Sequence, residues 1–177
     1  MKKLISLLIL FSVIFTGTDS FALSVREDVT ISCGLSEKEL ALGLLGELRS
    51  LAPEFIAAEE KYGVNAVFLA AVAALESGWG KFCFRPNNIF GWSGKNFDSK
   101  EECIDFVASK IAEHYLSENG KYYNGKTVAG VNICYNGNAF WEHKVLGIMA
   151  MIEKNAKEKQ PLKFAEKAAD FSVVFIG

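Results

Sequence analysis

A chain of 177 residues, 50% hydrophobic and 23% charged, has the length and composition of one globular domain with a sizeable core. Its formal net charge of −2 gives no reason to expect a nucleic-acid partner. The sequence shows no internal repeat and no low-complexity linker, so a single domain is expected after the N-terminal leader.

The leader, residues 1–22, has the pattern of a secretory signal peptide. It combines a basic start at Lys2–Lys3, an apolar stretch over 4–15 and a small-residue cleavage site at Ser20–Ala22. We therefore expect an exported protein that acts in the extracellular medium, the cell wall or the periplasm. Its single domain would cover 23–177, with no membrane span after cleavage.

Helix-start and helix-stop signals predict a mainly α fold beyond the leader. Ser36 with Glu39 has the spacing of a capping box and predicts a helix over 36–51. Pro53 suits the first turn of the next helix, which Gly63 ends.

Further along the chain, two more helices and a tail are predicted. A second capping box, Ser99 with Glu102, begins a helix that reaches residue 116, and a long helix follows over about 140–156. The tail from Pro161 is expected to add a helix and then an apolar end packed on the domain. No convincing strands alternate with these helices.

The stretch Asn65–Gly80 is the centre of the predicted fold. Asn65 is a favourable N-cap, and the ten residues Ala66–Leu75 are all apolar, which predicts a helix buried on every side. Glu76 ends this run, where burial and the negative end of the helix dipole are expected to raise the pKa of a carboxyl group. Such a carboxyl suits a general acid near neutral pH, whereas the alternative is a Glu that turns out to solvent.

Two motifs around this acid resemble a known enzyme family. ALESGWG ends at Gly80, and NNIFG spans Asn87–Gly91. Together they resemble the glucosaminidase family of peptidoglycan hydrolases, over roughly 53–154. The resemblance implies a lysozyme-like helical fold around the buried helix. It implies an enzyme without a cofactor that cleaves peptidoglycan glycan strands after N-acetylglucosamine, with Glu76 as the general acid.

The resemblance also implies residues on the other side of a substrate groove. Tyr135 matches a family tyrosine whose hydroxyl could bind the acetamido group or orient water, although it could instead anchor a loop to the core. Trp92 is the preferred sugar-stacking residue, while Phe90 is interpreted as core and Asn88 as holding its turn. Other substrate-binding candidates are Trp79, Tyr122, Tyr123 and Asn136.

A second carboxylate is harder to find. Many family members insert a β-hairpin after the NNIFG-like motif, but here only WSGKNFD precedes the next helix, so little or no hairpin is expected. Asp98 and Glu101 are the nearest candidates, because Glu102 is committed to its cap. The substrate's own acetamido group could serve as the nucleophile instead, and an inverting route with a distant carboxylate stays open.

One further motif is interpreted as a chance match. Gly120–Thr127 fits the phosphate-binding pattern, but that pattern works between a strand and a helix, and here a predicted helix leads in. No nucleotide partner is therefore expected. No metal is expected either, because His114 and His143 lack the spacing of a zinc helix and no CxxC occurs. His114 is interpreted as a solvated residue.

The cysteines are predicted to form at least one disulfide. An even number of cysteines in an exported chain favours disulfides, although free thiols stay open and four cysteines allow three connectivities. Cys83 and Cys134 each lie near one of the implied active-site motifs and are therefore the first candidate pair. The remaining two are Cys33 and Cys103.

Two other functions stay open. A muramidase or lytic transglycosylase would share the Glu76–Ser77 pair and an element like Tyr135–Gly137. However, this sequence has NIFG where sequences that resemble the transglycosylases have a Gly-Leu-Met-Gln motif. A non-catalytic wall-binding or assembly module on the same fold is disfavoured, because such a module has no use for a buried acid. The protein is expected to be a monomer.

Overall fold

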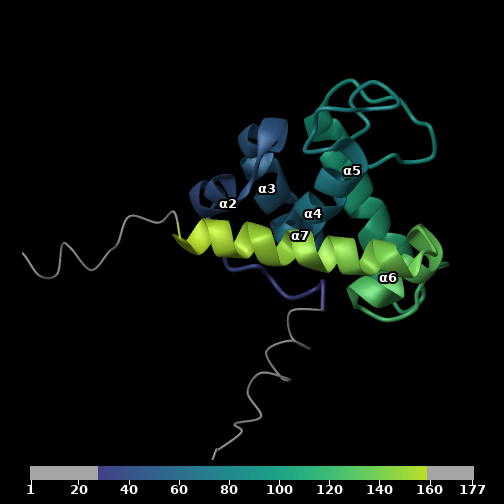
Figure 1. The fold of residues 1–177 in the computed structure, drawn as a ribbon. Coiled ribbons are helices and arrows are strands. Elements are labelled where there is room, and N and C mark those ends of the chain that lie inside the picture. Colours follow the sequence, from purple (N-terminus) through teal and green to yellow (C-terminus); the bar gives the residue numbers. More distant parts are fainter. Residues whose placement is uncertain (1–27, 159–177) are drawn as a thin grey trace, which may run out of the picture.

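The computed structural model describes residues 28–158, and they form a bundle of helices (Figure 1). In chain order the elements are α2 (Glu37–Gly43), the 3₁₀ turn η1 (Gly46–Leu51), α3 (Ala52–Tyr62), α4 (Ala66–Ser77), α5 (Lys100–Ile111), the π-helical segment η2 (Ala112–Leu116), α6 (Val128–Tyr135) and α7 (Ala139–Glu158). Within 28–158 the only β pairing is an isolated bridge between Asp28 and Thr127. The prediction of a mainly α, lysozyme-like domain without a β-hairpin is confirmed for this part of the chain.

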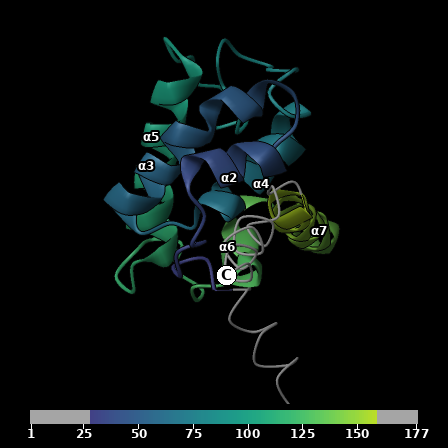
Figure 2. The same cartoon turned by 90° about the vertical axis from the view of Figure 1, so that its left-hand side faces the viewer.

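The central helix is α4. Asn65 accepts a hydrogen bond from the Phe68 backbone N–H and so caps its first turn, as predicted. Every residue from Ala66 to Ala74 is buried, so the predicted burial of the apolar run is confirmed up to Ala74, while its last residue, Leu75, is half-buried. In Figure 1 α4 lies behind α7, against which it packs, and α3 contacts it as well. Helix α7 packs against α2 as well as α4, and Figure 2 shows the same bundle turned by 90°.

The predicted helix starts are largely confirmed. Ser36 and Glu39 form a complete capping box at α2. Ser99 caps α5 by accepting from the Glu102 N–H, while the Glu102 carboxylate accepts from the backbone N–H of Asp98. Local capping chemistry therefore sets these helix starts.

The prediction of one helix over 36–51 is wrong. The chain is extended at Leu44 and Leu45, and Gly46 adopts a positive φ of 55° before η1 begins. The cause is a contact with the segment that leaves α4. The Glu47 N–H donates to the Trp79 carbonyl oxygen, and a Cβ at Gly46 would lie only 2.7 Å from that oxygen.

The sequence interpretation also missed α6, which follows the 117–127 loop and leads directly into α7. Thr127 caps α6 by accepting from the Gly130 N–H. The long loop from Gly78 to Ser99, at the upper right of Figure 1, contains no strand. No helix in 28–158 is both long and apolar enough to cross a bilayer. The leader and the tail from Pro161 lie outside the described residues.

Candidate active site

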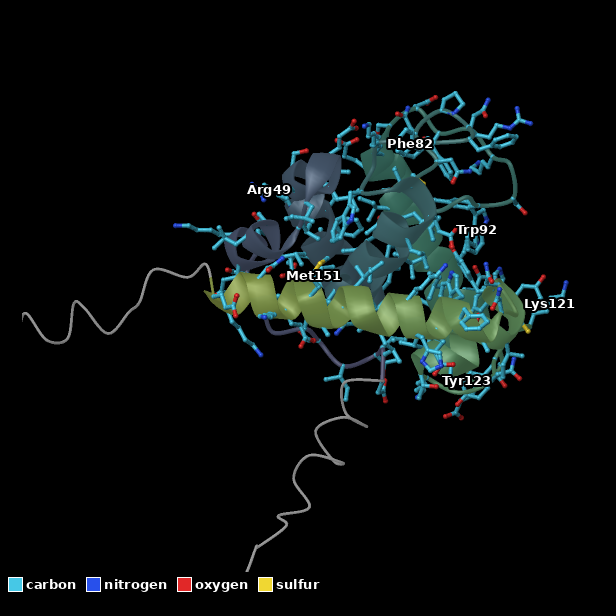
Figure 3. All side chains as sticks on the ribbon, viewed as in Figure 1. Arg49, Phe82, Trp92, Lys121, Tyr123 and Met151 are labelled. Carbon is cyan, nitrogen blue, oxygen red and sulfur yellow. The ribbon has the colours of Figure 1, made fainter. Side chains whose placement is uncertain are left out.

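A cleft of about 640 Å³ opens beside the end of α4. It lies between the loop that follows α4, the α5–η2 helix and the end of α6. Figure 3 shows two of its residues, Trp92 and Lys121, on the side of the molecule where α7 begins. Its lining residues are Glu76, Phe90, Gly91, Trp92, Ser93, Lys110, His114, Tyr115, Lys121, Tyr122, Cys134, Tyr135 and Asn136.

Glu76 occupies the last turn of α4 and faces this cleft. It is exposed, so the expectation of a buried acid is wrong: the apolar burial of α4 ends at Ala74, and the next turn reaches the cleft. Its Oε1 accepts a hydrogen bond of 2.8 Å from the indole Nε1–H of Trp141. A Cβ at Gly91 would lie 3.7 Å from its Oε2, so the NNIFG turn passes beside that oxygen. Trp141 therefore fixes one carboxylate oxygen while the side chain stays accessible.

The sharp turn after Glu76 is held by buried polar contacts. Ser77 is 1% exposed; its hydroxyl donates to the Ala73 carbonyl and accepts from the Gly80 N–H. Gly78 has a φ of 57°, the left-handed conformation that ends many helices. These contacts end α4 directly after the acid and send the chain away from the cleft.

Tyr135, the last residue of α6, also lines the cleft. Its hydroxyl donates to the Phe90 carbonyl oxygen at 3.1 Å, and its ring packs 5.3 Å from that of Trp141. Burial, and then the negative charge of Glu76, raise the pKa of the Tyr135 hydroxyl well above its usual value. The phenol is therefore neutral at physiological pH and keeps its proton for donation.

The NNIFG turn is organised by Asn88. Its Nδ2 donates to the carbonyls of Trp92 and Lys95, and its Oδ1 accepts from the Trp92 N–H. Asn88 is 3% exposed and Phe90 is 2% exposed, so both interpretations from the sequence are confirmed. This turn sets the Phe90 carbonyl toward Tyr135 and places Trp92 at the cleft.

Aromatic rings line one wall of the cleft. The Trp92 ring lies 6.4 Å from that of Tyr115 and 6.0 Å from that of Tyr135, and the Tyr115 ring lies 5.1 Å from that of Tyr122. Burial raises the pKa of the Tyr115 hydroxyl as well. Such a cluster offers apolar ring faces to the apolar side of a sugar ring and polar edges to its hydroxyl groups.

Several predicted site residues lie outside this cleft. Trp79 is half-buried and contacts Gly46, and it does not line the cleft. Tyr123 is half-buried and does not line the cleft either. Asp98 and Glu101 line a separate surface hollow together with Glu47. Among the predicted residues, the structure brings together Glu76, Trp92, Tyr122, Tyr135 and Asn136.

The sequence interpretation missed several lining residues. His114, assigned to solvent, lies at the cleft with its ring 6.2 Å from that of Tyr122. Lys110 comes from α5 and Lys121 from the following loop. The helical spacing of Lys110 and His114 was a usable signal, because residues four apart share one helix face. Nothing local to Lys121 indicates its position.

The predicted Cys83–Cys134 disulfide is wrong for this structure, in which all four cysteines are free thiols. Cys134 is exposed and lines the cleft, whereas Cys83 lies outside it, close enough to Cys103 to affect the pKa of that thiol. Burial is the main cause that raises the pKa of Cys103 to about 11, and burial likewise raises the pKa of Cys33 to about 11. These two thiols are therefore protonated and poorly nucleophilic at neutral pH.

The phosphate-binding pattern has the wrong surroundings. A helix does follow Thr127, but η2 leads into the segment instead of a strand. The lysine of the pattern, Lys126, lies outside the cleft with its Nζ 3.9 Å from Glu118 Oε1.

A helical domain whose cleft combines one carboxylate with aromatic rings is typical of glycoside hydrolases. Residues 52–154, more than half of the chain, match the glucosaminidase family, described as mannosyl-glycoprotein endo-beta-N-acetylglucosaminidase. The chain therefore belongs to the glucosaminidase family.

Curated relatives agree with this assignment. Two proteins from two strains of Streptococcus pneumoniae, each named "Putative endo-beta-N-acetylglucosaminidase", are 32% identical to the chain over 145 residues. The match covers 72% of this chain but only 22% and 20% of the two relatives. The chain thus spans about a fifth of the length of the curated relatives it matches.

Proposed function

We propose that the protein is an endo-β-N-acetylglucosaminidase that cleaves the glycan strand of peptidoglycan after N-acetylglucosamine, with Glu76 as the general acid. The observation that carries this proposal is the position of Glu76. It is the only carboxylate among the described residues that line the cleft, and Trp141 holds one of its oxygens. The family membership supports an N-acetylglucosaminyl bond as the target.

A cleft with one carboxylate favours participation of the substrate. In this mechanism Glu76 gives its proton to the glycosidic oxygen, and the bond between that oxygen and C1 of the N-acetylglucosamine breaks. The acetamido carbonyl oxygen of that N-acetylglucosamine bonds to C1 at the same time. Water then opens the cyclic intermediate at C1, and the Glu76 carboxylate takes the proton from that water. Asp98 and Glu101, which line the separate hollow, have no part in this route.

Tyr135 is suited to hold the acetamido group. Its hydroxyl proton is engaged with the Phe90 carbonyl, so its oxygen is available to accept a hydrogen bond from the acetamido N–H. That bond would turn the acetamido carbonyl toward C1. Trp92 and Tyr122 provide the ring faces against which a sugar can stack, and Asn136 provides an amide at the rim.

The proposed substrate also indicates where the protein acts. Peptidoglycan lies outside the cytoplasmic membrane, so the protein would reach it in the periplasm, the cell wall or the extracellular medium. The signal-peptide pattern of residues 1–22 supports this location.

Product analysis tests the proposal directly. Purified peptidoglycan digested with the protein should release fragments whose new reducing end is N-acetylglucosamine, as measured by mass spectrometry after borohydride reduction. Reducing-end muramic acid would instead identify a muramidase. Anhydromuramic ends would identify a lytic transglycosylase, and no release of fragments would favour a binding module.

Tyr135→Phe is expected to lower turnover roughly 3- to 10-fold, the value of one hydrogen bond to substrate. The ring packing remains, so the melting temperature should change little. Turnover should be measured per folded molecule, with circular dichroism giving the folded fraction. If the melting temperature falls sharply while turnover per folded molecule is unchanged, Tyr135 only anchors the Phe90 turn.

A further inference from the structure

Apart from Glu76 and the tyrosine and cysteine side chains, the ionisable groups that line the cleft are basic. They are Lys110, His114 and Lys121, from α5, η2 and the 117–127 loop. No described carboxylate other than Glu76 lines the cleft beside them. The chain as a whole is mildly acidic, so this basic wall is not a consequence of the overall composition.

Lys110 on α5 and His114 on η2 lie near the same acidic residue, Glu113. Lys110 Nζ lies 2.5 Å from Glu113 Oε2, and His114 Nε2 lies 3.7 Å from the same oxygen. Glu113 does not line the cleft, but it offsets part of the charge of Lys110. Lys110 is therefore the weaker candidate for binding an external anion.

Lys121 differs from Lys110 in this respect. Its Nζ lies 5.0 Å from the centre of the Tyr122 ring, and it forms no ion pair with a described carboxylate. Two backbone hydrogen bonds hold the loop around it in place. The Tyr122 N–H donates to the His114 carbonyl oxygen, and the Gly120 N–H donates to the Ser117 carbonyl oxygen. A Cβ at Gly120 would lie 2.5 Å from the His114 carbonyl oxygen, so the loop passes directly against η2. Backbone contacts thus hold at the rim of the cleft a cation that has no ion-pair partner among residues 28–158.

We propose that the cleft recognises a glycan bearing a carboxylate near the bond that is cleaved, and that Lys121 is the residue that selects it. This inference rests on the proposed function and narrows its substrate class. Peptidoglycan strands carry carboxylates on their peptide stems and on unsubstituted lactoyl groups, whereas neutral polymers of N-acetylglucosamine carry none. Lys121 would pair with such a group while the sugar lies against Trp92 and Tyr122.

The test compares one substrate in two charge states. Soluble peptidoglycan strands are used as isolated, and also after carbodiimide coupling to methylamine, which converts their carboxylates to neutral amides. The wild-type protein should show a KM about 5-fold lower for the acidic strands, with similar kcat, because an exposed ion pair contributes up to about 1 kcal/mol. Lys121→Gln should remove this preference by raising the KM for the acidic strands alone.

Lys126→Gln is the matched control, because Lys126 lies on the same loop but outside the cleft and next to Glu118. It should keep the preference for acidic strands. The proposal is overturned if the wild type does not distinguish the two substrates, or if Lys121→Gln keeps the full preference.

A binding experiment separates this inference from the proposed function. Cosedimentation with acidic and amidated peptidoglycan sacculi gives Kd in a Glu76→Gln background, where turnover is not needed. A 5-fold preference for acidic sacculi that Lys121→Gln abolishes supports the inference even if the bond cleaved is another one. Equal Kd values for the two kinds of sacculi overturn it, even if hydrolysis after N-acetylglucosamine is demonstrated.

Discussion

Replacing Glu76 with Gln is expected to lower glycan hydrolysis by at least ~10²-fold, because an amide cannot donate the proton that a general acid supplies. Gln has nearly the same shape, and its amide oxygen can still accept the hydrogen bond from Trp141 that Glu76 Oε1 accepts at 2.8 Å. Because Glu76 is exposed, the substitution leaves no buried polar group without a partner. The fold and the melting temperature should therefore be retained.

The measurement is turnover on purified peptidoglycan, with circular dichroism to confirm folding. Glu118→Gln is a suitable control, since Glu118 is exposed on the 117–127 loop and lies outside the cleft. It should keep wild-type turnover. Activity of the Glu76 variant within a few fold of wild type would refute the assignment of the acid and with it the proposed mechanism.

The parts of the fold that the sequence predicts well are those set by local chemistry. The caps at Ser36, Asn65 and Ser99 form because each side chain accepts a backbone N–H within its own first helical turn. The break at Gly46 could not be predicted in this way. It depends on the carbonyl of Trp79, a residue far along the chain that the folded structure brings beside Gly46 and Glu47. Helix α6 had a usable signal in the cap at Thr127, but its short span gives little periodicity.

The same division applies to the candidate site. Glu76, Trp92 and Tyr135 were placed by motifs, and the structure brings them to one cleft. The hydrogen bond from Trp141 to Glu76 joins residues far apart in the chain, and no local pattern indicates it. Lys121 reaches the cleft because its loop folds back on η2. Tertiary contacts of this kind decide which polar residues meet, so sequence patterns located Glu76, Trp92 and Tyr135 but neither Trp141 nor Lys121.

The burial of α4 leads to the second large effect. Phe68 lies about two turns before Glu76 on the same helix and is 0% exposed. Phe68→Ala is expected to lower the free energy of unfolding by about 3–5 kcal/mol, because it removes apolar contacts and leaves a cavity at the centre of the bundle. For a domain of this size the melting temperature should fall by roughly 10 °C or more. Phe68→Leu, which keeps most of the volume, should have a smaller effect.

Urea unfolding followed by circular dichroism gives these free energies, and Phe84→Ala provides the same chemical change at a residue that is 92% exposed. That control should alter the free energy of unfolding by no more than about 0.5 kcal/mol. Turnover per folded Phe68→Ala molecule, measured well below its melting temperature, should stay near wild type because Phe68 does not line the cleft. On one helix, Glu76→Gln would then lower turnover and leave stability unchanged, whereas Phe68→Ala would lower stability and leave turnover unchanged. Equal losses of stability in Phe68→Ala and Phe84→Ala would show that α4 is not the centre of the core.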